Sequence, residues 1–251
     1  MQTPKVIRRS FKGNKLYLLP LGDIHIGAPN CELEKARGFV NWAIEKGASV
    51  LGMGDIIENA NKGSVGAGVY EQKISPDEQI EVAIEFLKPL ADKKLLLGLL
   101  DGNHEWRTTK DSGVNITKQI CRGLKVPYLG YSIFLYIRVG KITYIIYASH
   151  GSTGSTTPQG KLKTILDWGK YIEADVYLMG HVHSLMAHSD IYRRINTTTK
   201  CCEDRKRYYV LTGSFLGYYG GYAEQKNYAP ERVGAPRIRL DGLRFDAHVS
   251  L

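Results

Sequence analysis

The stretch "LMGHVHSLM", residues 178–186, joins the end of an apolar run to two histidines that are one residue apart. If the run is a strand, the side chains of His181 and His183 leave the same face, roughly 6 to 7 Å apart along the chain. Two imidazoles in that arrangement can converge on one metal ion, although an isolated pair fits hydrogen-bonded surface histidines equally well. The stretch therefore predicts a buried strand that ends in a candidate metal site.

Four other apolar runs end in polar residues of the same kind. The runs cover residues 16–22, 49–54, 95–102 and 142–149, and they lead respectively to Asp23 and His25, to Asp55, to Asn103 and His104, and to His150. The length of each run is typical of a buried strand. Because open α/β sheets hold ligands at the carboxyl ends of their strands, we expect these polar residues to meet at one edge of a sheet.

Helical patterns separate the first strands, and hairpin patterns follow them. Helices are expected over residues 33–43, from the capping box SPDE at 75–78 to about residue 90, and from about residue 158 to 172. Hairpins are expected to turn near Gly140 and at Asp241-Gly242, with one or two strands between residues 191 and 212. These patterns predict an α+β fold of two mixed sheets packed face to face and flanked by helices, a four-layer α/β/β/α sandwich. We find no linker or internal repeat, so a single domain over residues 1–251 is expected.

Composition narrows the class of protein. The chain has 251 residues, of which 43% are hydrophobic and 24% are charged, as in ordinary soluble globular proteins. No apolar stretch is long enough to cross a bilayer and residues 1–15 contain no apolar signal region, which predicts a cytoplasmic protein without a membrane partner. The 4 cysteines lack CxxC spacing and are expected to be reduced thiols. The net charge of +9 favours a polyanionic partner such as nucleic acid, although solubility alone also accounts for it.

The candidate ligands share a chemistry of oxygen and imidazole nitrogen donors without a thiolate. They are Asp23, His25, Asp55, Asn103, His150, His181 and His183. Such a set suits Mn²⁺, Fe or Zn²⁺ and is a poor match for a structural zinc site. It is too large for one tetrahedral ion but fits two ions, about 3.5 to 4 Å apart, that share a bridging carboxylate and hydrolyse phosphate esters.

The motifs "GDIH", "GDIIEN", "GNHE", "SHG" and "GHVH" occur in that order between residues 22 and 183. This series resembles the DxH, GD, GNH(D/E), H and GHxH pattern of the calcineurin-like metallophosphoesterase superfamily. The resemblance implies a two-sheet sandwich flanked by helices, in agreement with the strand and helix patterns. It also implies a binuclear metal-dependent phosphoesterase that works by attack of a metal-activated hydroxide on phosphorus.

The resemblance also assigns roles to individual residues. It implies that Asp23, His25 and His183 hold one metal, that Asn103, His150 and His181 hold the other, and that Asp55 bridges the two. His104 would be a catalytic histidine that is not a ligand, contacts the phosphate and protonates the leaving oxygen. The cofactor would be two divalent metal ions, with Mn²⁺ favoured and Fe or Zn²⁺ as alternatives.

Some residues near the motifs have two interpretations. Glu58 and Glu105 either orient a histidine through a hydrogen bond or are ordinary surface or cap residues. His188 and His248, outside the motifs, are interpreted as structural or surface residues.

Two further segments raise the question of substrate contacts. Residues 151–164, GSTGSTTPQGKLKT, do not form a phosphate-binding P-loop because Leu162 follows Lys161, and we interpret them as a flexible loop on the substrate side. Lys161 and Lys163 either contact phosphates or lie on the solvated face of the next helix, which we favour. The tyrosine-rich residues 213–234 either stack on bases or pack internally, and packing is favoured. No substrate-binding residue is assigned.

Within the superfamily, the motifs favour the phosphodiesterase and nuclease side. The arginines of the phosphoprotein phosphatase motifs GDxVDRG and LRGNHE are missing, and Glu58 replaces the tyrosine ligand of purple acid phosphatases. The remaining classes are DNA-repair-type exonucleases, cyclic-nucleotide phosphodiesterases and small bacterial or phage phosphoesterases. The basic net charge favours DNA or RNA as the phosphodiester substrate. The short segment after residue 183 argues against the capping domain of repair nucleases. The alternatives are a phosphomonoesterase acting on a small molecule or phosphoprotein, and a non-catalytic accessory subunit of the same fold, against which the complete ligand set argues.

Overall fold

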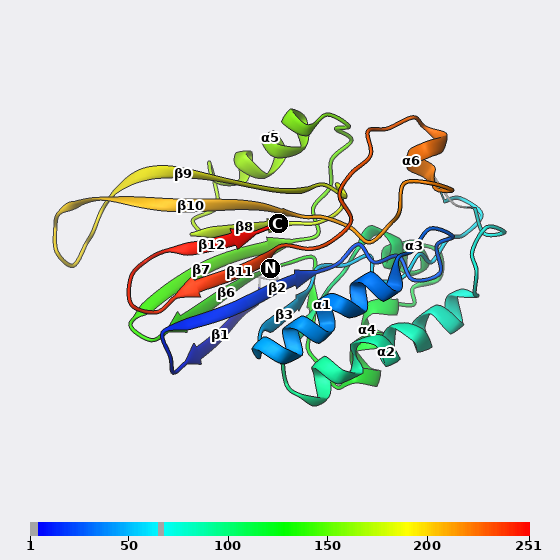
Figure 1. Cartoon of the computed structure of the whole chain (residues 1–251), viewed down its shortest axis with the longest axis horizontal. Helices are drawn as coiled ribbons and strands as arrows, with labels where there is room; N and C mark the ends of the chain where they lie inside the picture. The colour runs from blue at the N-terminus through cyan, green and yellow to red at the C-terminus, as the bar shows by residue number, and fades with distance from the viewer. Residues whose placement is uncertain (1–4, 65–67) are drawn as a thin grey trace.

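The computed structural model describes residues 5–64 and 68–251 and contains two mixed six-stranded sheets that lie face to face (Figure 1). The first sheet has the order β1-β6-β7-β8-β10-β9, with β1 Lys5–Phe11, β6 Ser132–Val139, β7 Ile142–Ser149, β8 Val176–Met179, β9 Leu185–Ile195 and β10 Cys202–Thr212. The second has the order β12-β11-β2-β3-β4-β5, with β2 Lys15–Leu21, β3 Ser49–Gly52, β4 Leu96–Leu100, β5 Tyr128–Gly130, β11 Arg237–Asp241 and β12 Ala247–Ser250.

Alternation along the strands creates the layers. In β8, Val176 and Leu178 belong to the core between the two sheets, whereas Tyr177 and Met179 pack on the outer side against α5 (Pro158–Trp168). Successive side chains of a strand point to opposite faces, so a strand that is apolar at every position must be covered on both sides. This explains why the uninterrupted apolar runs of the sequence form the centres of the sheets.

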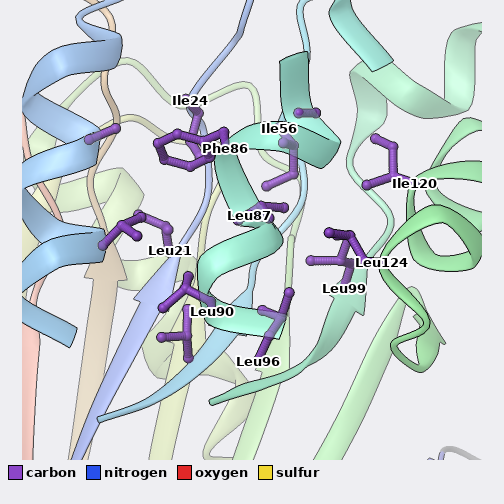
Figure 2. Close-up of a cluster of buried hydrophobic side chains, with 14 of the residues drawn as sticks. Leu21, Ile24, Ile56, Phe86, Leu87, Leu90, Leu96, Leu99, Ile120 and Leu124 are labelled. Carbon is purple, nitrogen blue, oxygen red and sulfur yellow. The ribbon is translucent and has the colours of Figure 1, made fainter. Parts of the chain in front are cut away.

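Helices cover the outer face of the second sheet. They are α1 (Leu33–Lys46), α2 (Pro76–Asp92) and α4 (Ile116–Leu124). Figure 2 shows Phe86, Leu87 and Leu90 of α2 in the cluster that also contains Leu21 of β2 and Leu99 of β4. With α5 on the opposite side, the order of layers is helix, sheet, sheet, helix, and the predicted α/β/β/α sandwich is confirmed.

Most predicted elements are present, with shifted ends. The five apolar runs form β2, β3, β4, β7 and β8, and the predicted capping box at Ser75 and Glu78 opens α2. The last predicted helix ends at Trp168 rather than near residue 172, because the chain turns at Gly169. Sequence patterns did not predict β1, β5, α3 (Asn103–Ser112), α4 or the short α6 (Tyr222–Gln225). The single-domain interpretation stays a prediction.

The pairing of the strands gathers their carboxyl ends. β2, β3 and β4 are parallel neighbours in the second sheet, and β7 and β8 are parallel neighbours in the first. The polar residues that follow these strands therefore meet at an edge shared by both sheets, which corrects the expectation of one sheet edge. α3 begins at this edge, and the β9–β10 hairpin extends from the opposite end of the molecule (Figure 1).

Among the described residues, 5–64 and 68–251, the structure has no helix with the length and apolarity that a membrane crossing requires.

We expect Leu178→Ala to lower the free energy of unfolding by about 2 to 5 kcal/mol, because it leaves a cavity between the sheets. Leu178 is fully buried. The matched control is Ile191→Ala on β9, where the side chain is 67% exposed, and there the change should stay within about 0.5 kcal/mol. Urea unfolding followed by circular dichroism measures both, and equal effects would contradict the core described here.

Candidate metal centre

All the residues predicted for the site lie at the shared edge, in the loops that follow the parallel strands. Asp23 and His25 follow β2, Asp55 follows β3, Asn103 and His104 begin α3 just after β4, His150 follows β7, and His181 and His183 follow β8. The structure thus brings together the seven predicted ligands and His104 from five separate strands.

The first group of donors consists of Asp23, His25 and His183. The Nε2 atom of His183 lies 3.2 Å from Nε2 of His25 and 3.3 Å from Oδ1 of Asp23. One donor atom from each of the three residues lies within 4.8 Å of the others. This is the trio that the family resemblance assigns to one ion.

The second group is centred on Asn103. Its Oδ1 atom lies 2.9 Å from Nε2 of His150 and 2.8 Å from Nδ1 of His181. Asp55, His150 and His181 also present donor atoms within 4.8 Å of one another. These residues are the set that the resemblance assigns to the other ion.

Asp55 lies between the two groups. Its Oδ2 atom is 3.3 Å from Nε2 of His150, in the second group, and 3.9 Å from Nε2 of His25, in the first. Burial alone would raise the pKa of this carboxyl, but the charges of His150 and His104 hold the pKa well below its usual range. An ionised carboxylate that reaches both groups is the geometry of a bridging ligand.

The hydrogen bonds behind the histidines leave ring nitrogens free for cations. Nδ1 of His150 lies 2.9 Å from the carbonyl oxygen of Met53, and Nδ1 of His25 lies 2.9 Å from Oε2 of Glu58. Since a carbonyl or carboxylate oxygen only accepts, each Nδ1 donates, and Nε2 is directed at the cluster. Facing Nε2 atoms, such as those of His25 and His183, need a proton or a cation between them. The donor set therefore fits divalent ions such as Mn²⁺, Fe or Zn²⁺.

The backbone at the site is held in an uncommon conformation. Positive φ angles occur at Asp23 (47°), His25 (55°), Asp55 (49°), His181 (68°) and His183 (56°). Non-glycine residues rarely adopt this left-handed region, which costs about 1 to 3 kcal/mol per residue and tends to occur at functional sites. Five of the seven predicted ligands carry this strain, which is consistent with loops shaped for function rather than for stability.

Two glycines allow the loops to approach one another. A Cβ atom on Gly102 would lie 2.1 Å from the backbone nitrogen of Asp55, and one on Gly180 would lie 2.7 Å from Oδ2 of Asp23. Any larger residue would push the ligand loops apart.

Glu105 fixes the loop that carries Asp55. Its buried carboxylate accepts hydrogen bonds from the backbone N–H groups of Asp55 (3.0 Å), Ile56 (2.7 Å) and Ile57 (3.1 Å). Burial first, and then the neighbouring Asp55 charge, raise the pKa of Glu105 to about 7. Of the interpretations of Glu105 from the sequence, the cap residue is confirmed, because the carboxylate also accepts from the backbone N–H of Gly102, the N-cap of α3, at 3.2 Å. It binds backbone rather than a histidine and is not on the surface. Glu58, by contrast, does orient a histidine, His25.

His104 lies within the cluster, and Arg107 lies beside it. Nδ1 of His104 is 2.7 Å from the carbonyl oxygen of Glu58, and Nε2 is 2.9 Å from Nη2 of Arg107, which donates to it. His104 also forms a group of close donors with His25 and Asp55. Sequence reasoning missed Arg107. Its spacing from His104 was no usable signal, because residues i and i+3 share a face only within a helix, and α3 was not predicted.

The remaining histidines, His188 and His248, are exposed on strands β9 and β12 and lie outside the cluster.

The chain matches no family model and no curated protein. Among solved structures, a predicted phosphoesterase from Streptococcus pneumoniae TIGR4 is 12% identical, with 94% of this chain and 88% of that chain covered and a TM-score of 0.41. A metallophosphoesterase from Sphaerobacter thermophilus is 13% identical, with 94% and 89% covered and a TM-score of 0.41. A double mutant of Vps29 from Entamoeba histolytica is 13% identical, with 94% and 98% covered and a TM-score of 0.42.

We expect Asp55→Asn to abolish metal retention, because it removes the charge that lies between both donor groups. The measurement is elemental analysis after reconstitution with Mn²⁺ and desalting. Asp175→Asn is the matched control, since Asp175 is a buried carboxylate that accepts from the backbone of Ile145 (2.8 Å) and should leave the metal content unchanged. Full retention of manganese by Asp55→Asn would rule out the bridging position.

Proposed function

We propose that the protein is a binuclear metal-dependent phosphodiesterase that acts on nucleic acid or nucleotides. The observation that carries the proposal is the position of the ionised Asp55 between two separate groups of donors. When bound, two divalent ions, with Mn²⁺ favoured and Fe or Zn²⁺ as alternatives, would supply Lewis acidity and lower the pKa of a water molecule.

The residues of the chain would bind these ions and leave one side open to substrate. One ion would be held by Asp23, His25 and His183, and the other by Asn103, His150 and His181. Asp55 would bind both ions. The carboxylates of Asp23 and Asp55 are buried, whereas the side chain of His183 is 34% exposed. A phosphate would therefore approach from the side of His181 and His183.

His104 is the proposed proton donor to the leaving oxygen. Burial lowers its pKa, but the charges of Asp55 and Glu58 outweigh burial, so that the pKa lies above its ordinary value. A raised pKa favours the protonated form that a general acid requires. Arg107 donates to Nε2 of His104 in this structure, and a bound phosphate would give its guanidinium an anionic partner and release Nε2 for the proton.

A pair of exposed aromatic rings supports a nucleic acid substrate. Trp106, three residues after Asn103, makes an edge contact with Tyr131, with ring centroids 5.4 Å apart. Both rings are exposed, and exposed aromatic rings can stack on bases. The net charge of +9 also favours a nucleic acid substrate, whose backbone is negatively charged.

A phosphomonoesterase is the second candidate, and Arg107 favours it. A guanidinium beside His104 is suited to the extra negative charge of a monoester dianion.

A cytoplasmic location is also part of the proposal, and free thiols at all 4 cysteines support it.

Hydrolysis of bis-p-nitrophenyl phosphate and of p-nitrophenyl phosphate with Mn²⁺ separates the two candidates. We expect a higher kcat/KM for the diester than for the monoester. A phosphodiester carries one negative charge, whereas a monoester dianion carries two and needs more cationic side chains than Arg107 alone. The opposite ranking would establish the monoesterase. If neither ester is hydrolysed, and single- and double-stranded DNA and RNA also stay intact although bound metal is detected, the chain is a non-catalytic subunit.

We expect His104→Ala to keep its metal and to lower kcat by roughly 10² to 10⁴, the usual contribution of a general acid. Elemental analysis and turnover are measured on the same preparation. His188→Ala, on the exposed surface of β9, is the control and should match the wild type. Loss of metal from His104→Ala would instead identify His104 as a ligand, and normal turnover would exclude the proton-donor role.

A further inference from the structure

A cavity of about 370 Å³ opens beside the metal centre, and His181 and His183 form part of its wall. Two segments supply most of the remaining wall. One is the loop over residues 153–156, which contributes hydroxyl groups, and the other is the strap, which we define as residues 214–231. The strap leaves the end of β10, contains α6 and leads back to β11 (Figure 1). It brings Tyr218, Tyr222 and Tyr228 to the cavity.

An ion pair between a largely buried lysine and a more exposed glutamate joins the strap to the body of the protein. Nζ of Lys161, on α5, lies 2.9 Å from Oε1 of Glu231 in the strap and 2.8 Å from Oγ of Ser184. The Lys161 side chain is only 12% exposed, so the solvated helix face favoured from the sequence does not describe it. Because Ser184 directly follows His183, the same contacts connect the strap to the metal centre. These contacts hold the strap in place as one wall of the cavity.

Tyr222 lies between the cavity and the cluster of metal-binding residues. It also lines a smaller cavity of about 100 Å³, together with His25, His104 and His183. Its ring makes an edge contact with that of Tyr228, with centroids 5.9 Å apart. A group attached to a phosphate at the metal centre would meet these two rings first.

We propose that this cavity binds the nucleoside of the nucleotide unit whose phosphate lies at the metal centre, with the base against Tyr222 and Tyr228. The inference rests on the proposed phosphodiesterase function and names its substrate subsite. Tyrosine rings offer the faces on which bases stack, and the hydroxyls of Thr153 and Ser155 are suited to the sugar and the base edge. The volume falls in the range of small-ligand sites, about 300 to 1,000 Å³. Because Glu231 neutralises Lys161, the cavity favours an uncharged group over a second phosphate.

Two diesters with the same leaving group test the subsite. Thymidine 5′-(p-nitrophenyl phosphate) and methyl p-nitrophenyl phosphate differ only in the group that would enter the cavity. We expect the wild type to have the higher kcat/KM for the thymidine ester, mainly through KM. Tyr222→Ala should lower this preference by about 5- to 150-fold, the factor that stacking of one base on an aromatic ring supplies. Tyr219→Ala is the matched control, because Tyr219 is 80% exposed and does not line the cavity.

Binding of free thymidine to the metal-free protein gives a readout that does not depend on catalysis. In saturation-transfer NMR we expect a signal from the wild type and from Tyr219→Ala, and loss of that signal in Tyr222→Ala. Thermal melting of the three proteins identifies a variant that is misfolded, in which case Tyr228→Ala replaces Tyr222→Ala.

Each outcome decides a separate claim. If both esters are hydrolysed but the wild type has no preference, or if Tyr222→Ala keeps the preference, the subsite is wrong and the phosphodiesterase stands. If neither ester is hydrolysed by metal-loaded protein while thymidine binds through Tyr222, the phosphodiesterase is wrong and the nucleoside cavity stands. Absence of thymidine binding together with absence of preference overturns the subsite.

Discussion

The buried carboxylate of Asp55 is the constraint around which the site is arranged. Burying an ionised carboxylate costs several kcal/mol unless other groups compensate its charge. The backbone N–H of His104 donates to its Oδ1 atom at 2.9 Å, and imidazoles face its Oδ2 atom. A second buried carboxyl, Glu105, accepts hydrogen bonds from the backbone of the same loop, and burial raises its pKa, whereas the pKa of Asp55 is lowered. Asp55 thus provides negative charge to the donor cluster, whereas Glu105 holds the backbone of the loop in place.

Packing of the two sheets compensates the conformational free energy that the strained loops cost. The positive φ angles of the ligand loops are imposed by strands whose side chains are packed on both faces. Further contacts restrain the loops from outside the strands. For example, the backbone N–H of Phe215, at the start of the strap, donates to the carbonyl oxygen of Asp23 at 2.8 Å. The strap is therefore hydrogen-bonded directly to Asp23, one of the predicted ligands.

The sequence predicts the local features well and the long-range ones poorly. Polar residues at the ends of apolar runs are a local signal, so Asp23, Asp55 and the other candidate ligands could be identified before the fold was known. The division of their strands between two sheets depends on pairing between distant segments, which periodicity does not encode. α3 escaped prediction because the residues NHEWRTTKDS have no apolar face. Lys161 was misinterpreted because its partner Glu231 lies 70 residues away in the chain.

The position of β1 at the border of the first sheet has a consequence for self-association. A strand with one unpaired side can recruit another chain, and natural proteins oppose this with charged side chains. β1 has the sequence KVIRRSF, and within the described residues 5–64 and 68–251 it pairs only with β6; Arg8 and Arg9 on this strand are exposed. Two copies that approached through this border would bring guanidinium groups of like charge together, which disfavours fibrous or sheet-extended aggregates of the protein.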